Sequence, residues 1–245
     1  MRVKLIIEYL GTNYCGWQTQ RDGNSVQAEI ERALMTVTGE KTEVEASGRT
    51  DKGVHAKGQV AHFDTQCSIP PDNFYKALNQ KLPLDIRIKS SEQVSNDFHA
   101  RFNTKRKTYC YNFYVSEVAR PILASTHAHI KPPFDFKLAH KCICEFEGEH
   151  DFKGFMSVGS NKENTVRTIY SCKLTYDKTD DTYALRVCGN GFLYNMVRII
   201  AGTVVAVGAG RISSGEIPAI IASRERAQAG STAPACGLVL EEVRY

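Results

Sequence analysis

The chain opens with apolar residues at every second position. These residues are Val3, Leu5, Ile7 and Tyr9, and their spacing predicts a strand with one buried face. A helical period follows and predicts a helix over residues 25–38. Its inward positions are Val26, Ile30, Ala33, Leu34 and Val37. We expect Asn24 to cap this helix, Gln27 to complete a capping box and Gly39 to end the helix.

Further apolar segments complete the pattern of the first half. Strands are predicted over residues 44–46, 54–64 and 86–88, and a second helix from Pro70 to about Leu82. The element order is therefore β-α-β-β-α-β. This order is typical of a ferredoxin-like unit, the plan that RNA-recognition domains share.

The second half repeats this kind of element order without a residue-level repeat. Its predicted elements are a strand that begins at Tyr109, a helix over 136–146, strands over 166–176 and 183–188, an apolar helix over 193–207, a short helix after the capping box of Ser213 and Glu216, and a closing strand over 238–245. Within 136–146, the residues expected to point inward are Leu138, Ala139, Cys142, Ile143 and Phe146. We expect two domains, over residues 1–104 and 105–245.

The composition is that of a folded chain. Of 245 residues, 42% are hydrophobic and 24% charged, which excludes a disordered, collagenous or coiled-coil protein. The net charge of +4 permits a nucleic-acid partner without requiring one. The longest uncharged apolar run, 199–210, is shorter than the roughly 20 residues that span a membrane. The first residues do not resemble a secretory signal, so we expect a cytoplasmic protein with eight reduced cysteines.

The densest polar cluster runs from Ser47 to His55, between two apolar segments. Asp51 stands there between the cations Arg49 and Lys52, which favour its ionised form. An ionised carboxylate on a tight loop can act as a nucleophile, a general base or a metal ligand. Taken locally, however, the segment is more typical of a solvated turn in which the aspartate caps a neighbour.

Cations and aromatic residues alternate between Phe98 and Phe113. The cations are Arg101, Lys105, Arg106 and Lys107, and the aromatic series of the predicted strand begins at Tyr109. Cations hold phosphates, and aromatic faces stack on unpaired bases. The alternative is a core strand preceded by a solvated charged segment. The combination favours binding to single-stranded nucleic acid.

Arg198 lies within the apolar segment 193–207. A cation in such a helix is costly unless it is paired, or unless its side chain extends to solvent. We expect a carboxylate partner, and Asp51 is the candidate.

A zinc site can be assembled from the second-half histidines and cysteines. The residues are His127, His129, His140, Cys142 and Cys144. Their spacing fits none of the usual zinc patterns, so we expect no metal site there.

Ser47–Ala56 closely resembles the signature loop of the TruA family of tRNA pseudouridine synthases. Further segments resemble family landmarks in family order across the whole chain. They are Tyr9–Gln18, Ala77–Asn79 with Leu82-Pro83, Phe98–Phe102, Asp151-Phe152, Val166–Ile169, Phe192–Arg198 and Ala233–Leu238. The resemblance reverses the local interpretation of Asp51.

The resemblance implies an isomerase that converts uridine to pseudouridine in the anticodon stem-loop of tRNA, at positions 38–40. The implied fold is α+β, with two ferredoxin-like halves forming a continuous mixed and antiparallel sheet around a central active-site cleft. A homodimer that needs no cofactor or metal is also implied.

The family's functional residues match three positions of this chain. Asp51 matches the catalytic aspartate, Tyr109 the tyrosine that packs on the target base, and Arg198 the arginine that pairs with the aspartate. Arg49 is expected to bind the substrate as well, and Lys105, Arg106 and Lys107 to hold RNA phosphates. Cys110 departs from the arginine usual in the family, which puts a backbone contact in doubt but not the chemistry. The alternative is a non-catalytic RNA-binding protein of the same fold, in which Asp51 would have no role.

Overall fold

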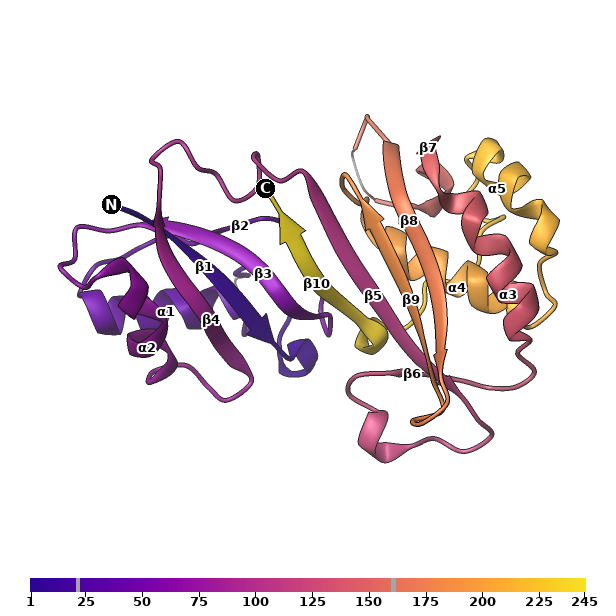
Figure 1. The fold of residues 1–245 in the computed structure, drawn as a ribbon, viewed down its shortest axis with the longest axis horizontal. Helices are drawn as coiled ribbons and strands as arrows, with labels where there is room; N and C mark the ends of the chain where they lie inside the picture. Colours follow the sequence, from indigo (N-terminus) through magenta and orange to yellow (C-terminus); the bar gives the residue numbers. More distant parts are fainter. Residues whose placement is uncertain (21–22, 160–161) are drawn as a thin grey trace. The chain divides into compact units, whose positions relative to one another are not determined.

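The computed structural model describes residues 1–20, 23–159 and 162–245, which form two compact units (Figure 1). The first unit comprises residues 1–105 and 240–245, and the second comprises 106–239. Each unit combines helices with its own strands, which confirms an α+β fold class. No helix among the described residues is both long and apolar enough to cross a membrane.

The first unit has the element order predicted from the sequence. Its elements are β1 (Arg2–Tyr9), α1 (Val26–Thr38), β2 (Glu45–Ala46), β3 (His55–Asp64), α2 (Phe74–Asn79), β4 (Ile86–Val94) and residues 240–244 of the C-terminal strand β10 (Leu238–Arg244). The strand order is β4-β1-β3-β10, and the short β2 pairs with β3. Strand β1 is antiparallel to both β3 and β4.

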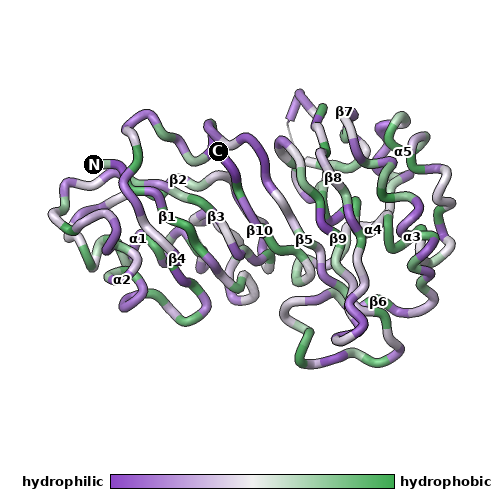
Figure 2. Tube along the Cα trace, viewed as in Figure 1, coloured by the Kyte–Doolittle hydropathy of each residue, from purple (hydrophilic) through white to green (hydrophobic). Residues whose placement is uncertain are grey.

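The alternation along β1 buries Val3, Leu5 and Ile7 completely. Figure 2 shows this strand as a strongly hydrophobic stretch between more hydrophilic ends. On helix α1, Ile30 and Leu34 are also fully buried. The core of the unit is therefore formed by the positions that the strand alternation and the helical spacing predicted to be buried.

The first turn of α1 corrects two predictions. Ser25, not Asn24, caps the helix, because Ser25 has the extended backbone of a cap and its Oγ accepts the Ala28 N–H at 3.1 Å. Gln27 forms no capping box, since its amide instead donates to Glu31. Gly39 ends the helix as predicted, in the left-handed conformation with φ 76°.

The second unit contains the remaining elements. They are β5 (Arg106–Val115), β6 (Ala128–Ile130), α3 (Phe136–Cys142), β7 (Gly148–Asp151), β8 (Val166–Asp177), β9 (Thr182–Gly189), α4 (Met196–Gly208) and α5 (Ile217–Ser223). The strand order is β5-β9-β8-β7, and β6 runs parallel to β5. Figure 1 shows the three helices gathered on one side of β8 and β9.

Two helices of this unit differ from their predictions. Leu138 was expected to point inward but is 43% exposed, because Ala139 and Cys142 occupy the buried stripe of α3. Helix α4 begins at Met196 rather than at residue 193, because Asn195 adopts a left-handed conformation that cannot continue a helix. The capping box of Ser213 and Glu216 is confirmed.

Short 3-10 helices complete the description. They are Gly11–Asn13, Pro71–Asn73, Pro121–Leu123, Ile143–Phe146, Lys153–Phe155, Ser214–Glu216 and Ala235–Gly237.

Candidate active site

Asp51 lies on the loop between β2 and β3, and β3 fixes the start of this loop. The Ser47 N–H donates to the Val60 carbonyl at 2.7 Å, and the Ser47 hydroxyl donates to Gln59 Oε1 at 2.8 Å. The buried Gln59 side chain also donates to the Gly48 carbonyl at 2.9 Å. One amide side chain therefore joins two successive residues of the loop to the sheet.

The residues beside Asp51 are held as well. The hydroxyls of Tyr9 and Thr50 lie 2.7 Å apart, and burial raises the pKa of Tyr9, so this phenol stays neutral. The Trp17 N–H donates to the Thr50 carbonyl at 3.0 Å, and the Val54 N–H donates to the Asp51 carbonyl at 3.1 Å. The backbone on both sides of Asp51 is thus fixed.

The segment 11–17 packs tightly against this loop. Gly16 has φ +108°, and a Cβ there would lie 2.6 Å from the Thr50 carbonyl oxygen. A Cβ on Gly11 would lie only 1.9 Å from the Val54 carbonyl oxygen. Two backbones approach so closely at these points that only glycine fits. The glycines of 11–17 therefore contribute to the position of Asp51.

Asp51 itself is half-buried, while Arg49 and Lys52 are exposed on either side of it. A carboxylate that is partly accessible and mounted on a fixed backbone is suited to act as a nucleophile or general base when ionised.

Tyr109 lies on β5, opposite Val187 of β9, in the second unit. Its ring meets the Phe192 ring edge-to-face, with 5.2 Å between centroids and an interplanar angle of 88°. The edge contact restrains the tilt of the tyrosine ring. Tyr109 is half-buried, so part of the ring is accessible to a ligand. The adjacent Cys110 is buried and its thiol donates to the Asn112 side chain at 3.2 Å.

Arg198 lies in the first turn of α4 and does not extend freely to solvent. Its Nε donates to the Ala233 carbonyl and its Nη1 to Asn195 Oδ1, both at 2.7 Å. Asn195 is itself held, because its amide donates to the Ser157 hydroxyl at 2.8 Å. The guanidinium therefore has a fixed direction.

The segment 233–234, whose Ala233 carbonyl accepts a hydrogen bond from Arg198, also binds a second side chain. The Tyr111 hydroxyl donates to the Pro234 carbonyl at 2.9 Å. Helix α4 and strand β5 thus bind consecutive carbonyls of the same segment, which fixes the surroundings of Arg198.

The predicted residues fall in both units. Asp51, Arg49 and Lys105 belong to the first, and Arg106, Lys107, Tyr109 and Arg198 to the second. Lys105 and Arg106 are exposed, and Lys107 is half-buried on β5. The pairing of Asp51 with Arg198 stays a prediction.

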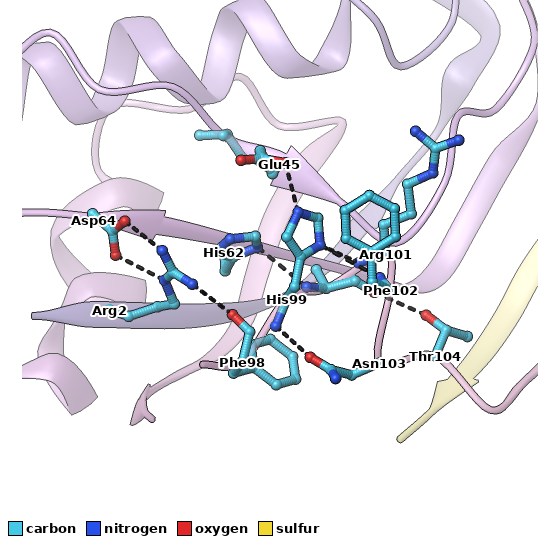
Figure 3. Close-up of polar contacts among 12 residues, drawn as sticks. Arg2, Glu45, His62, Asp64, Phe98, His99, Arg101, Phe102, Asn103 and Thr104 are labelled. Carbon is cyan, nitrogen blue, oxygen red and sulfur yellow. Dashed lines mark hydrogen bonds and ion pairs between the residues drawn. The ribbon is translucent and has the colours of Figure 1, made fainter. Parts of the chain in front are cut away.

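One group of metal-ligating side chains lies close together in the described residues. Glu45, His62 and His99 each offer a ligand atom, and these atoms lie within 4.8 Å of one another (Figure 3). Glu45 and His62 face each other across β2 and β3.

The hydrogen bonds of the His62 and His99 imidazoles argue against metal binding at this cluster. His62 Nδ1 accepts the Ala100 N–H at 3.3 Å, and His99 Nδ1 accepts the Arg101 N–H at 3.1 Å. Each neutral ring therefore carries its proton on Nε2, whereas a metal ligand needs its lone pair on that atom. His99 Nε2 instead lies 3.0 Å from Glu45 Oε2. The cluster is suited to hydrogen bonding.

Cys142, one of the two cysteines of the zinc alternative, is a poor ligand. The Cys142 thiol is buried and donates to the Ala139 carbonyl at 3.2 Å. Burial raises the pKa of Cys142 to about 12, so the thiolate that zinc requires is disfavoured.

Sequence reasoning missed three residues that support the site. Tyr9 and Gln59 hold the Asp51 loop, and Asn195 holds Arg198. Tyr9 and Asn195 lie in the family landmarks Tyr9–Gln18 and Phe192–Arg198, but neither was predicted to have a role at the site. A polar residue three positions before a helical arginine is a weak signal that could have indicated Asn195.

Comparison with known proteins identifies the family. Residues 5–103 and 143–245 match the family model described as tRNA pseudouridine synthase. A tRNA pseudouridine synthase A of Acetivibrio thermocellus is 49% identical over 99% of both chains. One of Ruminiclostridium cellulolyticum is 48% identical, over 100% of this chain and 99% of the relative.

A solved structure, a Cbf5-Nop10-Gar1 complex, matches 83% of this chain and 54% of its own chain at 10% identity and a TM-score of 0.35. That score is too low to add to the assignment. The sequence matches span nearly the entire chain and include the Asp51 loop, so the chain belongs to the family of tRNA pseudouridine synthases, isomerases that convert uridine to pseudouridine in tRNA.

Proposed function

We propose that this enzyme isomerises uridine at positions 38–40, in the anticodon stem-loop of tRNA, with Asp51 as the reactive carboxylate. The observation that carries the proposal is the loop geometry. Asp51 is half-buried between exposed cations, on a backbone held by Tyr9, Trp17 and Gln59. Such preorganisation serves a group that must meet a reacting atom in one orientation.

The reaction breaks the bond between uracil N1 and ribose C1′ and forms a bond between C5 and C1′. In one route the Asp51 carboxylate bonds to C1′ while N1 leaves with the electron pair. The uracil anion then rotates, C5 attacks C1′ and the carboxylate is displaced. Loss of the C5 proton and protonation of N1 complete the isomerisation. Attack at C6 or removal of a sugar proton are alternative routes. Each needs an ionised Asp51.

Tyr109 is proposed to pack on the target base. Its edge contact with Phe192 supports this role, because the restrained ring offers a defined surface. Arg198 is proposed as the counter-ion of Asp51. Two hydrogen bonds from its guanidinium at 2.7 Å support a fixed positive charge.

The target nucleotide has to leave its helix, which costs a few kcal/mol. We propose that Arg49, Lys105, Arg106 and Lys107 offset this cost by binding phosphates, and three of these four side chains are exposed. We also propose that the enzyme acts as a homodimer.

The site of modification can be tested with an unmodified tRNA transcript that has uridine at positions 38–40. After incubation with the full chain, pseudouridine should map to those positions. The matched control transcript carries cytidine there and should gain none. Pseudouridine formed only elsewhere would contradict the anticodon assignment, and RNA binding without any pseudouridine would favour the non-catalytic alternative.

A further inference from the structure

Phe102 presents an aromatic ring to solvent on the turn that follows β4. Its side chain is 75% exposed. The His99 ring lies beside it, with centroids 4.2 Å apart, and the Arg101 guanidinium carbon lies 5.7 Å from the Phe102 centroid (Figure 3). Because this ring is not buried in the core, it is available to contact a ligand.

The turn that carries this ring is fixed by its own hydrogen bonds. The His99 N–H donates to Asn103 Oδ1 at 2.5 Å, and His99 Nδ1 accepts the Arg101 N–H at 3.1 Å. The Ala100 carbonyl accepts the Thr104 hydroxyl at 2.8 Å. The exposed ring is therefore mounted on a preorganised backbone.

Two further contacts connect the same turn to the rest of the unit. The Ala100 N–H donates to the buried His62 at 3.3 Å, and the Tyr245 hydroxyl donates to the Ala100 carbonyl at 2.7 Å. Because the turn loses little freedom on binding, a contact made by Phe102 costs little ordering entropy.

The charges beside Phe102 fit a polyanion. Arg101 and Lys105 are exposed on the same segment. The carboxylate of this cluster, Glu45, already faces His99 at 3.0 Å. A protein partner would need a broader apolar surface than one ring among polar side chains. An aromatic ring with a guanidinium beside it is instead the combination that binds unpaired nucleotides.

We propose that Phe102 and Arg101 form an RNA-contact point, in which the Phe102 ring stacks on an unpaired base of the substrate and Arg101 binds an adjacent phosphate. This inference rests on the proposed function for the identity of the RNA. Phe102 and Arg101 are binding residues here, and no step of the isomerisation passes through them.

The test measures the dissociation constant of the full chain for unmodified tRNA by fluorescence anisotropy. Phe102→Ala should weaken binding about tenfold, and Phe102→Leu should do nearly the same, because both lack an aromatic face. Phe102→Tyr should stay within about twofold of the unchanged chain. Leu84→Ala is the matched control, since Leu84 is another apolar side chain of the first unit and is 90% exposed.

The salt dependence of the dissociation constant distinguishes the phosphate contact of Arg101 from the stacking contact of Phe102. Arg101→Ala should lower the slope of log Kd against log salt by about one, whereas Phe102→Ala should leave the slope unchanged. Melting temperatures should match for all variants, because the substituted side chains are exposed. Equal affinities for Phe102→Ala, Phe102→Tyr and Leu84→Ala would overturn the stacking role.

Pseudouridine mapping with the unchanged chain keeps this test separate from the proposed function. If that chain modifies positions 38–40 while Phe102→Ala binds normally, the contact point alone is wrong. If that chain modifies other positions while Phe102→Ala binds weakly, the anticodon assignment is wrong and the contact point stands.

Discussion

The Tyr9 hydroxyl lies 2.7 Å from Thr50 Oγ1 and so joins the first strand to the residue directly before Asp51. Both side chains are buried, so this bond is shielded from water. The strand that forms the core of the unit therefore also helps to fix the backbone that carries Asp51, the carboxylate proposed to react.

Tyr9→Phe should lower kcat by about tenfold or more while KM changes little, because Asp51 loses orientation and the RNA contacts remain. The buried Thr50 hydroxyl also loses a partner, at a cost of about 1–2 kcal/mol in the free energy of unfolding. Steady-state kinetics and denaturant titration measure the two effects. Tyr114→Phe is the control, since it removes a buried hydroxyl that accepts the Arg120 N–H at 2.9 Å in the second unit. Equal losses of kcat in both variants would argue against a specific role for Tyr9.

Gly16→Ala should abolish most activity and destabilise the first unit. Its Cβ would lie 2.6 Å from the Thr50 carbonyl oxygen, and φ +108° is itself unfavourable for alanine. Gly210→Ala separates these causes, because Gly210 also has positive φ, +69°, but its Cβ would meet no atom within 4 Å. That control should be destabilised by about 1 kcal/mol and keep its kcat. Similar kcat values for the two variants would refute the packing argument.

Full activity should require the side-chain oxygen of Asn195, which accepts a hydrogen bond from Arg198. Asn195→Gly tolerates φ 60° but leaves Arg198 Nη1 without the acceptor at 2.7 Å, so kcat should fall about tenfold. Asn195→Asp keeps an acceptor and should retain most of the activity. The comparison is made by tritium release from tRNA at saturating substrate. Full activity in the glycine variant would show that this bond does not position Arg198.

Stability should depend on pH through His62. Burial is the largest cause that lowers the pKa of His62, and Arg2 and His99 add to it, while Glu45 and Asp64 act in the opposite sense. Between the lowered folded value and the ordinary value near 6.5, the unfolded chain binds more protons, so the free energy of unfolding rises with pH. This contribution is present above pH 6.5 and is lost as pH falls below it.

His62→Asn should flatten that dependence. The asparagine oxygen can accept the Ala100 N–H in place of Nδ1, but it does not titrate. Urea unfolding at pH 5 and pH 7.5 should therefore give a smaller difference than in the unchanged chain. His140→Asn, at an exposed position, should leave the difference unaltered. An unchanged pH dependence in His62→Asn would contradict the assignment.

Periodicity was sufficient to predict most elements but not their ends. The apolar alternation predicted β1 and the helical spacing predicted α1, whereas the cap fell on Ser25 because backbone conformation, not residue type alone, selects it. Strands β6 and β7 have three and four residues, too short for a period to be recognised. The closing strand was predicted, but periodicity carries no information that residues 240–245 cluster with the first unit.

The candidate site was predictable where chemistry is concentrated in one segment. Asp51 was notable for its charged neighbours and Arg198 for its apolar surroundings, but the local pattern favoured a solvated turn at Asp51, and only the family resemblance indicated its proposed role. The supporting contacts were not predictable, because Gln59 and Tyr9 meet the loop only through strand register. The Glu45–His62 pair likewise depends on the pairing of β2 with β3.

Tritium release from tRNA labelled at uracil C5 tests the role of Asp51 most directly, because the label is lost only when C5 forms its new bond to the sugar. Asp51→Asn keeps the size of the side chain and removes its charge, and Asp72→Asn is the control at an exposed position of the same unit. We predict that Asp51→Asn binds tRNA with unchanged affinity and releases no tritium above background, while Asp72→Asn matches the unchanged chain. Substantial tritium release by Asp51→Asn would contradict the account.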